Sequence, residues 1–195
     1  MAMRELTEFL MDLRDNPQAV ERAAGRVNEV LMKALDMHYS IVQPKLGGYA
    51  HWFGYWAPGK TITIQEDAMG LCSPEMYRDI FMQYSKAVVE HLGPYVLFHV
   101  HSTGYRHYTH VLDIPGLAGM EIALETIGPT LSDLVPVFRE ILEKSRLMLH
   151  VFTGFEHLPE ALRKLPHEGL FLAIPDKYVP TDGAYREFIA ANWKG

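Results

Sequence analysis

Short apolar runs alternate with longer segments of helical periodicity along most of the chain. Segments with apolar residues three and four positions apart predict helices at 6–13, 17–37, 74–92, 134–142 and 185–193. The apolar runs have the length and composition of buried strands and lie at 61–65, 95–101, 119–124, 147–152 and 169–174. This alternation predicts an α/β fold built on a parallel sheet.

Several predicted helices have clear ends. Asn16 and Pro17 have the residue types of an N-cap and a first helical position. Ser73, Pro74 and Glu75 repeat that arrangement, with the glutamate placed favourably for the helix dipole. The Gly93-Pro94 pair ends this helix before the next strand, so the region reads as a β-α-β unit.

Two histidines stand one residue apart at the end of the run 95–101. Side chains alternate across a strand, so His99 and His101 should project from the same face. Two neutral imidazoles at this spacing can hold one divalent metal ion. The alternative is that neighbouring groups simply satisfy them by hydrogen bonds.

Other polar side chains also follow predicted strands. In parallel α/β folds, reactive groups gather at the carboxyl ends of the strands. Besides the two histidines, the residues at these ends are Glu66, Asp67, Glu125, Thr153 and Asp176. We expect His150, inside an apolar strand, to be a core histidine with hydrogen-bond partners, and His107 to face solvent.

The segment 47–59 is rich in glycine and aromatic residues and fits neither a helix nor a solvated linker. It could form a lid over a flat substrate, with Trp52 and Trp56 lining a cofactor pocket. Alternatively, its rings anchor a loop to the core or form an oligomer interface.

Composition narrows the class of protein. The 195 residues, 48% of them hydrophobic, suffice for one substantial core, so we expect one domain with a helical and aromatic part at 1–58 and a β/α part at 59–195. A net charge of −6 without a basic stripe argues against nucleic acid. The single Cys72 and the lack of a signal-like or membrane-length apolar run predict a cytoplasmic protein without membrane contact.

The order of these motifs resembles the carboxyl-terminal part of the uroporphyrinogen decarboxylase superfamily, which includes cobalamin-dependent methyltransferases. The similarity covers about residues 60–195. It rests on the acidic strand end followed by the Ser73-Pro74-Glu75 helix start, and on the pair His99 and His101 with Gly104 shortly after. The later strand ends at Glu125 and Gly154, and the Pro180-Thr181 helix entry, follow in the family's order.

The resemblance implies a (β/α)8 barrel that binds substrate at the carboxyl ends of its strands. Complete barrels need about 250 residues, and five or six strands are predicted here. We therefore expect a shortened or partial barrel that is either part of a longer ancestor or completed by a second copy of the chain.

The family's methyltransferases bind zinc through a His-x-Cys pair and a later cysteine. Here His101 takes the place of the first cysteine, and Asp176 is the substitute in the later segment. The resemblance therefore implies a zinc site of His99, His101 and Asp176, with Glu66, Asp67 or Glu125 as orienting or catalytic carboxylates. An incoming thiol would bind the open zinc position and accept a methyl group from a corrinoid or a corrinoid carrier protein.

Three alternatives remain open. A metal-free decarboxylase acting on a porphyrinogen would use Asp67 to stabilise a cationic pyrrole, although the decarboxylase's arginine-rich and late histidine-glycine motifs are absent. A metal hydrolase would use the same histidines to generate hydroxide. A non-catalytic tetrapyrrole- or corrinoid-binding protein would use Trp52 and Trp56 without turnover.

Overall fold

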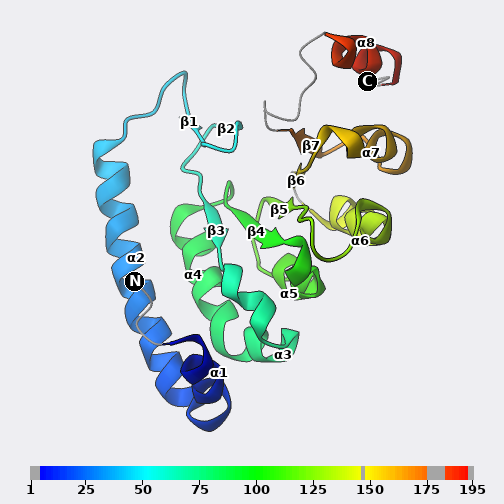
Figure 1. Ribbon diagram of the computed structural model, residues 1–195. Helices are drawn as coiled ribbons and strands as arrows, with labels where there is room; N and C mark the ends of the chain where they lie inside the picture. The colour runs from blue at the N-terminus through cyan, green and yellow to red at the C-terminus, as the bar shows by residue number, and fades with distance from the viewer. Residues whose placement is uncertain (1–4, 146–147, 175–182, 193–195) are drawn as a thin grey trace.

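The computed structural model describes residues 5–145, 148–174 and 183–192. Its centre is a sheet of five parallel strands in sequential order, with helices packed along it (Figure 1). The strands are β3 (Thr63–Gln65), β4 (Leu97–His101), β5 (Gly119–Ala123), β6 (Met148–Phe152) and β7 (Leu170–Ala173). All five predicted strands are confirmed, and each observed strand is one or two residues shorter than predicted.

Helices connect successive strands. They are α4 (Met82–Leu92), α5 (Tyr108–Leu112), α6 (Leu131–Lys144) and α7 (Leu158–Lys164), followed after β7 by α8 (Ala184–Asn192). Crossovers between parallel strands are almost always right-handed, so sequential strand order places these connecting helices on one face of the sheet. Figure 1 shows α5, α6 and α7 following one another along the strands. The fold class is therefore mixed α/β with a parallel sheet.

The first helices of the described residues are α1 (Leu6–Asp15) and α2 (Pro17–Ile41), and α2 runs beside α4 (Figure 1). Pro17 takes the first helical position as predicted, whereas the structure gives the Asn16 side chain no capping hydrogen bond. A hairpin of two short strands, β1 (Tyr49–Ala50) and β2 (Trp56–Ala57), follows. No helix in the described ranges combines the length and apolarity needed to cross a membrane.

The helix predicted at 74–92 is interrupted. Ser73 caps α3 (Pro74–Met76) by accepting a hydrogen bond from the Met76 backbone, as predicted. A π-helical turn, η2 (Tyr77–Phe81), then precedes α4. The wider turn holds a fully buried Tyr77, whose hydroxyl lies 3.1 Å from the Ser85 hydroxyl. Gly93, with φ of +97°, ends α4 in a conformation that glycine adopts readily.

The two faces of the sheet have different compositions. On one face, large apolar side chains pack with the helices in the main core, and they include Ile64, Phe98, Val100, Met120, Ile122, Leu149 and Val151. On the opposite face, strand pairing aligns His99 with Glu121 and Glu121 with His150. All three are buried. The strands, which the sequence presents as buried apolar runs, therefore carry a buried polar row on this face.

Candidate metal centre

Adjacent strand ends bring three potential metal ligands together. His99 and His101 lie on the same face of β4, as their spacing predicted. Asp67 follows the end of β3 and begins the 3-10 helix η1 (Asp67–Leu71). Because β3 and β4 are parallel neighbours, their carboxyl ends meet at one edge of the sheet. Sequence reasoning placed Asp67 here as a supporting group, and the structure puts it among the possible ligands.

The three side chains converge on one point. His99 Nε2 and His101 Nε2 each lie 3.5 Å from the same Asp67 oxygen, Oδ1. One ligand atom from each residue lies within 4.8 Å of the others. The two imidazole rings are 4.8 Å apart and nearly perpendicular, at 85°. A cation placed between the three atoms would meet two nitrogens and one oxygen.

Each histidine is also held from its other side by a carboxylate. His99 Nδ1 contacts Glu121 Oε2, and His101 Nδ1 lies 3.0 Å from Glu125 Oε1. The Glu125 contact is an ion-pair distance without hydrogen-bond alignment at His101 Nδ1. A carboxylate beside Nδ1 favours the tautomer with its proton on that nitrogen, which leaves the Nε2 lone pair free, as is usual for metal-bound histidines. Both free nitrogens then face Asp67. This arrangement fits a divalent ion of the zinc class, which accepts nitrogen and oxygen ligands.

Glu125 is fixed by further contacts. Thr103 Oγ1 donates to Glu125 Oε2 at 2.8 Å, and the Glu125 backbone N–H donates to Ser102 Oγ at 3.1 Å. Partial burial acts to raise the pKa of Glu125, but the Thr103 hydrogen bond and the nearby His101 outweigh it, so the pKa is lowered. The Glu125 carboxylate is thus kept in its charged form, which favours an N–H on the facing Nδ1 of His101.

The metal cluster is buried on the His99 side and exposed to solvent on the side of His101 and Asp67. The His99 side chain is only 8% exposed, whereas those of His101 and Asp67 are 36% and 61% exposed. Structural zinc sites are fully enclosed by protein ligands, whereas catalytic sites keep one position for substrate or water. Three protein ligands with one exposed side match the second type.

Glu66 takes a different direction from its neighbour Asp67. It accepts a hydrogen bond from Ser85 Oγ of α4, close to the buried Tyr77. Burial raises the pKa of Glu66 to about 7, and the Ser85 hydrogen bond offsets this only in part. Of the two acids predicted at this strand end, Asp67 joins the histidines and Glu66 contacts the helix layer.

The other predicted site residues lie apart from the cluster or outside the described part of the chain. Asp176, the predicted third zinc ligand, lies outside the described residues. Trp52 is 76% exposed and Trp56 is 50% exposed, and neither contacts the cluster in the structure. The ring that reaches the site from this hairpin is Phe53, 6.2 Å from the His99 ring.

Glu121 is the functional candidate that sequence reasoning missed. Its signal was a single acidic residue within the otherwise apolar β5, and it is 1% exposed in the structure. Charged side chains are almost never buried without a specific partner. The residue is not recognisable as a partner of His99 until the register of β4 and β5 is known.

Two histidines differ from expectation. His150 is fully buried between Phe53 and Phe171, and neither ring nitrogen has a hydrogen-bond partner among the described residues. Burial lowers the pKa of His150 to about 4. His107, expected in solvent, is fully buried with its ring 5.6 Å from that of Tyr77. The predictions of a satisfied His150 and an exposed His107 are therefore wrong.

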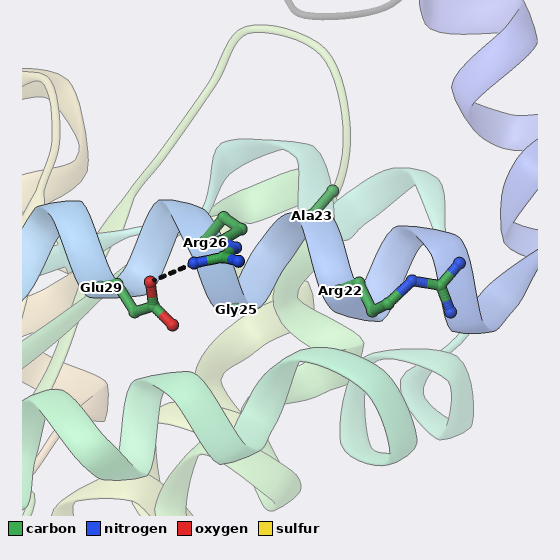
Figure 2. Close-up of a pocket in the computed structure, with 5 residues that line it drawn as sticks. All are labelled: Arg22, Ala23, Gly25, Arg26 and Glu29. Atoms are coloured by element: carbon green, nitrogen blue, oxygen red, sulfur yellow. Dashed lines mark hydrogen bonds and ion pairs between the residues drawn. The ribbon is translucent and has the colours of Figure 1, made fainter.

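A separate hollow lies along α2, away from the cluster. It is lined by Arg22, Ala23, Gly25, Arg26 and Glu29, all from one helix (Figure 2). Arg26 and Glu29 form an ion pair of 3.1 Å there, and both side chains are largely exposed. This shallow surface contains none of the candidate ligands.

Comparisons with known proteins add no assignment. No family model, curated protein or solved structure matches the chain. The chemistry of the Asp67, His99 and His101 cluster is therefore argued from its own geometry.

Proposed function

We propose that the protein is a zinc-dependent enzyme of the uroporphyrinogen decarboxylase superfamily, and that it transfers a methyl group between a corrinoid and a thiol. The convergence of His99 Nε2 and His101 Nε2 on Asp67 Oδ1 carries this proposal. The resemblance of residues 60–195 to the methyltransferases of that superfamily supplies the reaction type. Zinc held by these three residues would lower the pKa of a thiol that occupies the open position.

The chain's own residues prepare the site for this reaction. Glu121 contacts His99 Nδ1 and Glu125 lies 3.0 Å from His101 Nδ1, and these negative charges favour the tautomers whose Nε2 lone pairs face the ligand position. Asp67 completes the set from the exposed side, where a thiol can enter. Phe53 covers the inner side of His99 and limits access of water from that direction. Trp52 and Trp56 are exposed on the same hairpin, where they offer flat surfaces to a corrinoid.

The proposed architecture is a partial (β/α) barrel. The sequential parallel strands and the cluster at their carboxyl ends support this. In this proposal the outer strands β3 and β7 pair with further strands, and a second copy of the chain supplies them. A solution mass equal to one chain under assay conditions would contradict completion by a second copy without affecting the metal site.

Hydrolysis is the second candidate, and one observation favours it. The described cluster contains nitrogen and oxygen ligands and no sulfur, and catalytic zinc sites with two histidines and a carboxylate activate water in known hydrolases. Cys72 cannot change this set, since it is buried and its thiol donates to the Met69 carbonyl. The two reactions differ in whether turnover requires an added thiol.

Metal analysis and activity together test the proposal. Purified protein should contain about one zinc ion per chain, and His99→Ala and His101→Ala should each lose it, whereas the exposed His38→Ala should retain it. With methylcobalamin and mercaptoethanol, the zinc form should demethylate the corrinoid, and chelator should stop the reaction. Protein that cannot be loaded with zinc overturns the metal site, while ester hydrolysis without thiol and no demethylation would favour the hydrolase.

A further inference from the structure

The face of the sheet beside the metal cluster contains buried polar atoms without partners. Glu121 is 1% exposed, and its Oε1 has no hydrogen-bond partner among the described residues, although Oε2 contacts His99. Both ring nitrogens of the fully buried His150 also have no hydrogen-bond partner among the described residues. Buried polar groups are nearly always hydrogen-bonded, and each one left unpaired is costly. Two adjacent exceptions therefore call for a functional explanation.

These groups lie side by side in the sheet. Strand register places His99, Glu121 and His150 in one row across β4, β5 and β6. The Phe53 ring lies 6.2 Å from the His99 ring and 5.7 Å from the His150 ring. Neighbouring strands are about 4.8 Å apart, so a ring about equally far from the two outer members of the row lies over the middle one. A phenyl group, which cannot donate a hydrogen bond, thus covers Glu121.

The segment that carries Phe53 is a short loop whose hydrogen bonds are largely internal, because the Phe53 backbone N–H donates to His51 Nδ1 at 3.2 Å and the Gly54 N–H donates to the His51 carbonyl at 3.0 Å. The hairpin strands β1 and β2 are each two residues long. Gly54, which follows Phe53, has φ of +86°, and the neighbouring Trp52 is largely exposed with its ring 3.9 Å from that of Phe53. Short strands and an exposed anchor make this part of the molecule easier to displace than the sheet beneath it.

The row of His99, Glu121 and His150 determines which kind of ligand could take the place of the Phe53 ring. A carboxylate oxygen accepts hydrogen bonds and attracts positive charge, so Glu121 Oε1 needs an N–H donor. The flat space now taken by a phenyl ring, with Phe171 4.7 Å from His150 on the far side, suits a planar group. His150 can add one donor and one acceptor when it is neutral.

We propose that Glu121 and His150 form a binding site for a flat, positively charged head group with N–H donors, such as an amidinium, which enters the place of the Phe53 ring. The head group stacks beside His99 and donates to Glu121 Oε1, next to the metal cluster. As a site for the substrate's head group, this inference rests on the proposed function. As a binding site, it stands on these side chains alone.

Calorimetric titration of the full chain tests the site. The probe is benzamidinium, which combines a phenyl-sized ring with an amidinium, and benzoate is the anion of matching shape. Benzamidinium should bind at least tenfold more tightly than benzoate, both in protein as purified and after chelator treatment. Its binding should also change the emission of Trp52, and Trp52→Phe should lose that signal.

Three variants locate the binding. Phe53→Ala should bind benzamidinium at least tenfold more tightly, because no ring has to be displaced. The near-isosteric Glu121→Gln should bind it at least tenfold more weakly, whereas Glu90→Gln, which removes the charge of an exposed carboxylate on α4, should bind it within twofold of the parent. Thermal melts of each variant verify that it is folded.

The inference is overturned if benzamidinium does not bind, if benzoate binds equally well, or if Phe53→Ala leaves the affinity unchanged. These outcomes are independent of the proposed function, since zinc content is measured on the parent protein without the probe. Conversely, a chain that binds benzamidinium but no zinc would retain the head-group site and lose the proposed reaction.

Discussion

The helix-covered face of the sheet and its opposite face are built from alternate residues of the same strands, yet they satisfy different requirements. On the first, Phe98 and Ile122 are fully buried in a continuous apolar core. On the second, His99 and Glu121 are almost as deeply buried but are polar and only partly paired. The apolar face stabilises the fold, whereas the polar face lowers stability because it buries reactive groups that are only partly hydrogen-bonded. The contrast predicts that neighbouring residues will respond to substitution in opposite ways.

The largest effect should come from the apolar face. Phe98→Ala removes a fully buried ring and should lower the free energy of unfolding by about 3–5 kcal/mol. Because Phe98 points away from the cluster, the folded fraction should keep its zinc affinity. Chemical denaturation and zinc titration measure the two quantities. If zinc affinity fell as far as stability, the two faces would not be separable.

The pH dependence of His150 should be smaller but distinctive. Its pKa is about 4 in the fold against an ordinary value of 6.5, so the folded state favours the neutral ring. Stability should therefore fall as the pH drops from about 6.5 to about 4, by about 2–3 kcal/mol. His150→Leu should remove this loss, as measured by urea unfolding at several pH values. An unchanged acid slope in the variant would show that His150 is not the cause.

The carboxylate behind His101 should affect metal binding more than folding. Glu125→Gln removes the charge that orients His101 and should reduce zinc affinity about 10- to 100-fold. Stability without metal should change by less than about 1 kcal/mol because the side chain is partly exposed. Competition with a coloured chelator gives the affinity. A variant with parental zinc affinity would mean that Glu125 does not support the site.

Substitution of Glu66 should have the smallest effect on stability, and its pH dependence should be opposite to that of His150. The pKa of Glu66 is raised to about 7 from 4.5 by burial against the helix layer, so its protonated form is favoured in the fold. Its contribution is present below pH 4.5 and is lost as the pH rises through 7. Glu66→Gln should therefore stabilise the metal-free protein at pH 8 by about 1–2 kcal/mol, as measured by thermal unfolding with chelator. Destabilisation at pH 8 would refute this.

Local patterns were sufficient to predict most of the fold. The strand runs, the Ser73 cap and the shared face of His99 and His101 are all found in the structure. These features depend on residues close in sequence, whose side-chain period and capping chemistry are fixed by the backbone. The π-turn at Tyr77–Phe81 was not predictable in this way, because it involves the long-range burial of Tyr77.

The candidate site was predictable only in part. The histidine pair and Asp67 could be found at strand ends, but their convergence depends on how β3 and β4 pair. The pairing of Glu121 with His99, and the position of Phe53 over this row, require the register of three strands and the path of the hairpin. Sequence supplied the chemical groups, whereas tertiary structure determined which of them meet.

The ligands and their supporting carboxylates all lie between residues 67 and 125, in the contiguous stretch that contains β4 and β5. Closing the site therefore requires only neighbouring loops of the chain to come together, at low entropic cost. Bound metal would protect this stretch from hydrogen exchange as a unit, while β6 and β7 could open without releasing the ion. The coordination site would thus be encoded in a single contiguous segment, which favours its transfer into other β/α scaffolds.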